Sequence, residues 1–143
     1  MLDPIIVKNS EYIFLKTQQG GKKGALTVLE GEKDVPFSIK RVYYITKIEA
    51  LTQVRGLHAH KKLDQVIFCM NGSFLLHLDD GIRKQDILMN SEAVGVRLGP
   101  ELWHSMKDFS PDCIIMVVAS DHYSEDDYIR DYGEFIKYLE FNH

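Results

Sequence analysis

The side chains best suited to chemistry are three imidazoles at two places in the chain. His58 and His60 stand two residues apart, and His104 follows later, directly after Trp103. In a β-strand, residues two apart project from the same face, so His58 and His60 would share one surface. Neutral imidazole binds metals and also accepts protons near neutral pH. The pair therefore predicts either a metal site or a site of proton transfer.

The residue types around the pair help to choose between these two chemistries. A carboxylate shortly after the pair would favour a cation, but the chain has Gln65 there, and an amide brings no negative charge to offset that of a metal. We therefore expect acid–base use of His58 and His60, with no resident metal and no other cofactor. A metal-dependent enzyme with His58, His60, Gln65 and His104 as ligands is the alternative. A purely structural pair beside so many cationic residues would be an unusual way to build an apolar core.

Other residues suit an anionic, oxygen-rich ligand. Arg41 and Tyr43 alternate onto one face of the run 40–45, so both would point at the histidines if that face lines the interior. Arg41 and Arg55 could hold a diphosphate or stabilise an oxyanion, because guanidinium is always charged and matches such oxygens in geometry. Trp103 could form a stacking wall for a base or sugar, although a packing role is equally compatible with the sequence.

Strands must position these residues, because the hydrophobic period is that of β-structure until the last twenty residues. Asn71-Gly72 and Asp79-Asp80-Gly81 stand between apolar runs and predict tight hairpin turns between antiparallel neighbours. We therefore predict an all-β sandwich or barrel. The tail differs, since Ser124 is a good N-cap and apolar residues then recur at helical spacing. This pattern predicts one C-terminal α-helix over residues 124–140.

Length and charge limit the possible functions. With 143 residues, 45% of them apolar, the chain suits a single domain (1–143) that encloses a ligand cavity. A formal net charge of −4 disfavours a nucleic-acid partner, whose phosphates select basic surfaces. The sequence has no apolar run of membrane-spanning length, and its first residues lack the order of a signal peptide. We therefore expect a soluble, cytoplasmic protein without a membrane partner.

Two motifs, the His-x-His run and the later Gly-Pro turn with Trp103-His104, resemble the signature motifs of the cupin family, whose fold is a jelly-roll barrel. Four ordered strings are more specific and resemble the dTDP-sugar 3,4-ketoisomerases, which are small cupins. The likeness extends from about Gly24 to Leu139. The strings are residues 35–44 (VPFSIKRVYY), 55–63 (RGLHAHKKL), 99–106 (GPELWHSM) and 119–123 (ASDHY).

The resemblance implies a metal-independent isomerase that acts on dTDP-4-keto-6-deoxyglucose. It also implies a homodimer that exchanges N-terminal strands from residues 1–30, and a role in making the precursor of 3-amino-3,6-dideoxyhexoses for glycans such as lipopolysaccharide or the S-layer. Whether the C4 product is galacto or gluco does not follow from the motifs.

The residues found independently suit this reaction. A carbonyl at C4 acidifies the hydrogen on C3, so a base can form an enediolate that is reprotonated at C4. We predict His58 as the base, His60 as its partner and Tyr43 as a hydrogen-bond donor to the oxyanion. Arg41, Arg55, Trp103 and His104 are the predicted substrate-binding residues. A 3,5-epimerase on the same substrate and a non-catalytic sugar-nucleotide-binding cupin are further alternatives.

Overall fold

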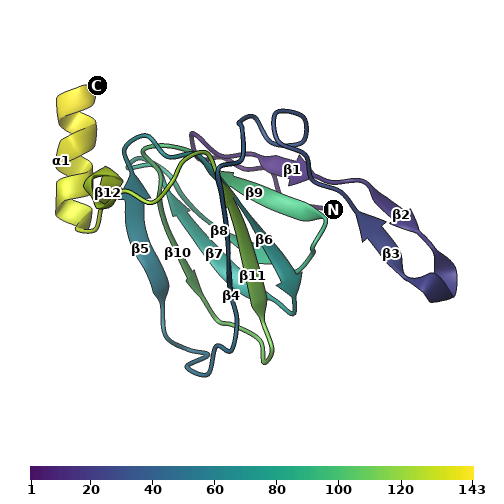
Figure 1. Ribbon diagram of the computed structural model, residues 1–143. Helices are drawn as coiled ribbons and strands as arrows, with labels where there is room; N and C mark the ends of the chain where they lie inside the picture. Colours follow the sequence, from purple (N-terminus) through teal and green to yellow (C-terminus); the bar gives the residue numbers. More distant parts are fainter.

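Short runs of β-branched and aromatic residues form most of the structure, a computed structural model that describes residues 1–143 (Figure 1). One short α-helix, α1 (Tyr132–Asn142), follows the last strand. The strands are β1 (Tyr12–Phe14), β2 (Thr17–Gln19), β3 (Ala25–Thr27), β4 (Arg41–Ile45), β5 (Arg55–His60), β6 (Gln65–Asn71), β7 (Phe74–Asp79), β8 (Lys84–Met89), β9 (Val94–Leu98), β10 (Trp103–Lys107), β11 (Ile114–Ala119) and β12 (Tyr128–Ile129).

The strands form two five-stranded antiparallel sheets and one separate hairpin. The order in the first sheet is β1-β9-β6-β11-β4, and in the second it is β12-β5-β10-β7-β8, so consecutive strands repeatedly change sheet. The β2–β3 hairpin extends away from both sheets (Figure 1). This arrangement confirms the predicted all-β, cupin-like fold with a C-terminal helix.

The two predicted hairpin turns have different outcomes. Asp79-Asp80-Gly81 does join the antiparallel neighbours β7 and β8. Asn71-Gly72 does not, because β6 pairs with β9 and β11 while β7 pairs with β10 and β8. Gly72 has a φ of 74° there, and the side chain of Asn71 donates to the Asp112 carbonyl. The local turn prediction was correct in conformation and wrong in connectivity, since the turn carries the chain from one sheet to the other.

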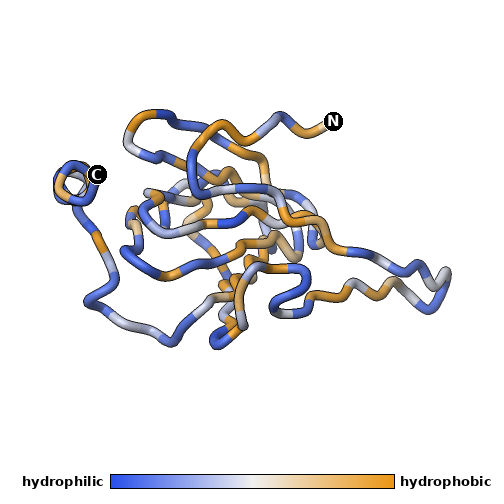
Figure 2. The backbone as a smooth tube through the Cα atoms, turned by 90° about the horizontal axis from the view of Figure 1, so that it is seen from above, coloured by the Kyte–Doolittle hydropathy of each residue, from blue (hydrophilic) through white to orange (hydrophobic).

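The main core lies between the two sheets. It is built from inward-facing residues such as Ile67 on β6, Leu76 on β7 and Val117 on β11. A second cluster, which includes Phe68 and Val118, lies on the outer face of the first sheet, where residues 29–39 cover it. Figure 2 shows apolar segments gathered where the strands pack and hydrophilic segments at the tip of the hairpin.

The C-terminal helix begins later than predicted, at Tyr132 instead of residue 124. Asp131 is the N-cap, and its side chain accepts a hydrogen bond from the Glu134 N–H. The preceding residues are held in β-structure, because Tyr128 and Ile129 pair with His60 and Ala59 of β5. The side chain of Ser124 makes no capping bond. The helix, of eleven residues, is too short and too polar to cross a bilayer.

Candidate active site

The three predicted imidazoles meet on the inner face of the second sheet. His58 and His104 occupy paired positions of β5 and β10, and their ring centroids are 4.7 Å apart. His60, one strand repeat further along β5, lies 5.0 Å from His58 and 6.1 Å from His104, ring to ring. His60 and His104 are buried. Strand alternation puts His58 and His60 on one face, and the pairing of β5 with β10 brings His104 beside them.

The facing sheet contributes three polar residues. Arg41 and Tyr43 share the inner face of β4, and the Arg41 guanidinium lies 5.3 Å from the centre of the Tyr43 ring. Gln65, at the start of β6, is 1% exposed and donates from Nε2 to the Tyr43 hydroxyl at 3.2 Å. The prediction that Arg41 and Tyr43 face the interior agrees with Tyr43 packing against the main core.

Several polar atoms of this cluster are buried without a partner in the protein. Most buried polar groups are hydrogen-bonded, so unpaired ones call for an explanation. Four of the five buried side-chain atoms that lack a partner belong here, which suggests that a polar ligand supplies the missing bonds. They are Arg41 Nε, His58 Nδ1, His60 Nε2 and Gln65 Oε1.

Burial keeps the imidazoles neutral and the phenol protonated. Burial, together with the proximity of His58, lowers the pKa of His60 to about 4, although Asp127 acts in the opposite direction. Burial also lowers the pKa of His58 and, more strongly, that of His104. Burial raises the pKa of Tyr43, so its hydroxyl remains a donor. Near neutral pH the site thus contains proton acceptors beside a hydrogen-bond donor.

The segment before the helix supplies a wall that sequence reasoning missed. The centre of the Tyr128 ring lies 5.0 Å from that of the His58 ring and 4.4 Å from that of the His60 ring. The Arg130 guanidinium lies 4.1 Å from the centre of the same Tyr128 ring. Asp127 contacts His60 through a hydrogen bond. Residues 125–127 fall within the predicted helix 124–140, and no local signal in them indicates contact with β5.

Two predicted substrate-binding residues, Trp103 and Arg55, lie outside the buried cluster. Trp103 points to the opposite face of the sheet from His104, and it packs against Tyr132 and Phe135 at ring distances of 5.3 and 5.8 Å. We therefore correct its assignment from a stacking wall to the packing role, because alternation places neighbours on opposite faces. Arg55 is exposed at the start of β5. Its positive charge opposes in small part the rise that burial causes in the pKa of Tyr43.

The imidazoles also have the spacing of a possible cation site. His58, His60 and His104 each offer a ligand atom, and these atoms lie within 4.8 Å of one another. These three ligands include no carboxylate, so they bring no negative charge to offset that of a divalent cation. The donor atoms fit a cation in number and distance, and the set brings no negative charge of its own.

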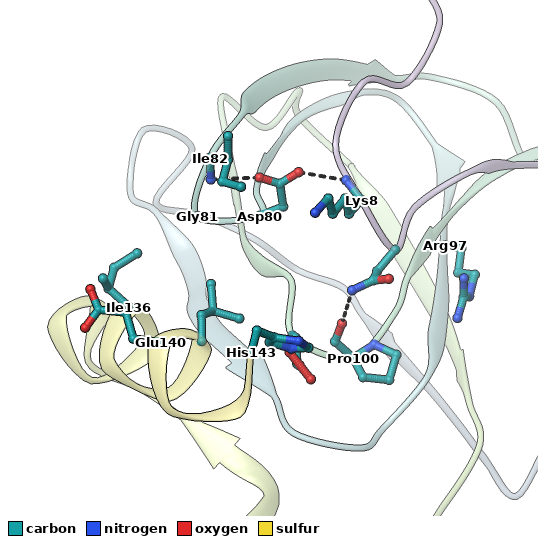
Figure 3. A pocket seen from close by; sticks show the side chains of 12 residues that line it. Lys8, Asp80, Gly81, Ile82, Arg97, Pro100, Ile136, Glu140 and His143 are labelled. Atoms are coloured by element: carbon teal, nitrogen blue, oxygen red, sulfur yellow. Dashed lines mark hydrogen bonds and ion pairs between the residues drawn. The ribbon is translucent and has the colours of Figure 1, made fainter.

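A hollow larger than the one beside the histidines lies elsewhere in the molecule. A cavity of about 670 Å³ lies between α1, the Asp80-Gly81 turn and the Pro100-Glu101 turn (Figure 3). Its polar groups largely bond one another, as with Lys8 N–H to Asp80 and His143 to Glu101. A smaller hollow of about 200 Å³ borders the histidines, lined in part by Arg41, His60 and Tyr128. We assign the chemistry to the histidine cluster, where the unpaired atoms are.

Two facing sheets that enclose a polar, histidine-containing interior define a cupin-like enzyme. Comparison with known proteins agrees, since residues 8–140 match the family model described as FdtA: WxcM-like, C-terminal. The chain belongs to this family. A relative that is named as a 3,4-oxoisomerase is 56% identical to this chain, which confirms the family predicted from the four motifs. The protein is an isomerase of the 3,4-ketoisomerase type.

Three relatives illustrate the likeness. The TDP-4-oxo-6-deoxy-alpha-D-glucose-3,4-oxoisomerase of Aneurinibacillus thermoaerophilus is 56% identical over 119 residues, covering 82% of this chain and 84% of that protein. The sugar 3,4-ketoisomerase QdtA of Thermoanaerobacterium thermosaccharolyticum, solved in complex with TDP, is 42% identical, with a TM-score of 0.91 over 96% of this chain and 98% of that one. The TDP-quinovose 3,4-ketoisomerase WlaRB of Campylobacter jejuni is 40% identical, with a TM-score of 0.86 over 92% and 99%.

Proposed function

We propose that this protein converts dTDP-4-keto-6-deoxyglucose into a dTDP-3-keto-6-deoxyhexose through an enediolate. The observation that carries the proposal is the pair of neutral imidazoles, each with an unpaired ring nitrogen, facing Arg41, Tyr43 and Gln65 across the barrel. The substrate is inferred from the relatives that are named for this sugar or were solved with TDP.

The reaction needs two proton relocations and no net oxidation. The C3 hydrogen leaves as a proton and C4 gains one, while the C3 hydroxyl loses its proton and the C4 carbonyl oxygen gains one. We assign removal of the C3 proton to His58 and relay of the hydroxyl proton to His60. Tyr43 donates a hydrogen bond to the oxyanion, and Arg41 stabilises the negative charge that develops there.

The remaining predicted residues have less direct roles in this scheme. His104 lines the sugar pocket beside His58. Arg55 is placed at the rim, where its exposed guanidinium would attract the diphosphate. We give Trp103 no binding role in this scheme, because it packs under the helix on the outer face of the sheet.

The proposal is tested by a proton NMR time course with dTDP-4-keto-6-deoxyglucose in deuterated buffer, using chelator-treated protein of measured metal content. We expect a 3-keto product with deuterium at C4, and its coupling constants give the C4 configuration. Exchange at C3 and C5 with the ketone still at C4 would identify an epimerase. Binding of dTDP without any exchange would identify a binding protein.

The same preparation separates the metal-dependent alternative from the proposed mechanism. The three imidazoles satisfy the distances of a cation site, so metal analysis is needed. We expect chelation to leave turnover unchanged. Activity that is lost with stoichiometric metal and restored by its return would replace our mechanism with a metal-assisted one.

We also propose a homodimer. Val42 and Tyr44 are exposed on β4, an open edge of the first sheet, and Leu26 and Val28 are exposed on or beside the protruding hairpin (Figure 1). β1 pairs with β9 of its own chain, so an exchange of N-terminal segments would involve the hairpin β2–β3. Sedimentation of the wild type and Leu26→Lys tests this, with a shift of the variant towards monomer expected.

The 3-keto product suggests which reaction follows, and we propose that an aminotransferase consumes it. A ketone at C3 is the group that an aminotransferase converts to an amine, which agrees with synthesis of 3-amino-3,6-dideoxyhexoses for lipopolysaccharide or S-layer glycans. We propose that the enzyme acts in the cytoplasm, where nucleotide sugars are made. Cell fractionation and the loss of the aminosugar in a deletion strain test these proposals.

A further inference from the structure

We propose that Asp127 is a positioning residue that holds His60 with its Nε2 lone pair directed at the reacting atoms. The inference rests on the proposed isomerase function and extends it to a residue outside β5. Asp127 belongs to the segment that precedes β12 and the helix. It reaches His60 because β12 pairs with the end of β5 (Figure 1).

The hydrogen bonds around Asp127 determine which nitrogen of His60 carries a proton. Asp127 Oδ2 lies 3.1 Å from His60 Nδ1 and 3.2 Å from the Leu63 N–H, while Oδ1 accepts from the Lys62 N–H at 2.8 Å. A carboxylate can only accept, so neutral His60 must donate from Nδ1. Its Nε2 is then the unprotonated nitrogen, and this atom is buried without a partner in the protein.

The backbone fixes Asp127 as firmly as its side chain does. Its carbonyl accepts from the Lys61 N–H at 2.9 Å, and its own N–H donates to the Ser124 carbonyl at 3.1 Å. Three successive N–H groups of the turn that follows β5 therefore donate to Asp127. The side chain of His60 is 2% exposed and that of Asp127 17% exposed, so water competes little for their bond.

This geometry gives His60 the properties that a proton relay requires. The bare Nε2 can take the hydroxyl proton of the substrate, and the resulting imidazolium then lies against a carboxylate. The negative charge offsets part of the penalty that burial imposes on the charged ring. Without Asp127, His60 would lose both its fixed tautomer and this stabilisation.

The alternative is that Asp127 only ties the segment before the helix to the β5–β6 turn. Asp80 provides a matched control for that role, because its carboxylate accepts from the Lys8, Ile82 and Arg83 N–H groups at 2.8, 2.8 and 2.7 Å and contacts no histidine. Asp80→Asn perturbs its loop bonds in the way that Asp127→Asn does, since each variant keeps one acceptor oxygen, and it does not touch the site.

The test compares Asp127→Ala, Asp127→Asn and Asp80→Asn by kinetics and by ¹⁵N NMR of the imidazoles. The His60 signals are assigned by their absence in His60→Gln. In the wild type we expect a protonated Nδ1 and an unprotonated Nε2. We expect Asp127→Ala to lose this preference and about 100-fold in kcat, with KM and dTDP affinity nearly unchanged. Asp127→Asn, which keeps one acceptor oxygen, should lose at least about tenfold.

Two results would overturn the inference. One is a wild-type His60 that carries its proton on Nε2. The other is a pair of Asp127 variants whose kcat falls no further than that of Asp80→Asn after correction for the folded fraction. A wild-type protein that does not isomerise the substrate would instead refute the proposed function, and the tautomer measurement would still decide whether Asp127 orients His60.

Discussion

The two faces of the second sheet differ although the same strands build both. On β5, Ala59 points outward between the inward-pointing His58 and His60, and on β10 Trp103 points outward beside His104. The outer face is an apolar cluster in which Ala59, Trp103 and the helix residue Phe135 are packed together. The inner face at this end has unpaired nitrogens and depressed histidine pKa values.

Because of this difference, adjacent residues of one strand contribute to different properties of the protein, one to stability and the next to function. The outer face contributes apolar burial, which stabilises the fold and does not require polar partners. The inner face keeps polar groups out of water and without partners, which destabilises the folded protein but prepares the groups for a ligand. The predicted consequence is that substitutions on the two faces affect different measurements.

The largest expected effect is that of His58→Asn on turnover. Removal of the base should lower kcat by about 10³-fold while dTDP still binds, since the proposed scheme assigns the diphosphate to Arg55 and not to His58. NMR time courses measure kcat, and calorimetric titration measures the binding of dTDP. His77→Asn is the matched control, because His77 is an outward-facing residue of β7 that bonds Asp86. Wild-type turnover in His58→Asn would contradict the role given to the inner face.

Phe135→Ala should show the reverse behaviour. Phe135 is fully buried against Trp103, so its truncation should lower the free energy of unfolding by about 3–5 kcal/mol. The folded fraction should keep its kcat and KM, measured below the unfolding transition. Phe141→Ala on the same helix, where the side chain is exposed, should change stability by less than about 0.5 kcal/mol. Altered kinetics in folded Phe135→Ala would show that the faces are coupled.

Acid should destabilise the protein through the inner face. Burial lowers the pKa of His60 from its ordinary value near 6.5 to about 4. Between these values the unfolded chain binds more protons than the folded one, so the free energy of unfolding falls as the pH falls through this window. For His60 alone the loss is about 3 kcal/mol. Denaturant unfolding at pH 7 and pH 4.5 should show a smaller difference in His60→Gln than in the wild type; equal differences would exclude this origin.

Tyr43→Phe tests the smallest of the four effects. The hydroxyl of Tyr43 remains protonated because burial raises its pKa, and its loss should remove one donor to the oxyanion. We expect kcat to fall by about 100-fold with little change in KM. Tyr44→Phe, on the exposed side of the same strand, is the control. Equal kinetics for the two variants would remove Tyr43 from the mechanism.

Local periodicity accounts for what could be predicted. The two-residue spacing of His58 and His60, and of Arg41 and Tyr43, sets which side chains share a face, because alternation follows from the strand backbone alone. The β-rich pattern and the four motifs also indicate the fold and the family. These features depend on neighbours in the sequence, which the chain itself specifies.

Contacts between distant segments were decided only by the tertiary structure. Asn71-Gly72 crosses between sheets instead of joining neighbours, because strand partners depend on packing across the whole barrel. Trp103 lies under a helix whose position its own strand does not encode. Asp127 reaches His60 because two residues of β12 pair with β5 and delay the start of the helix. The sequence by itself determined which residues share a strand face, and the folded barrel determined which of them meet.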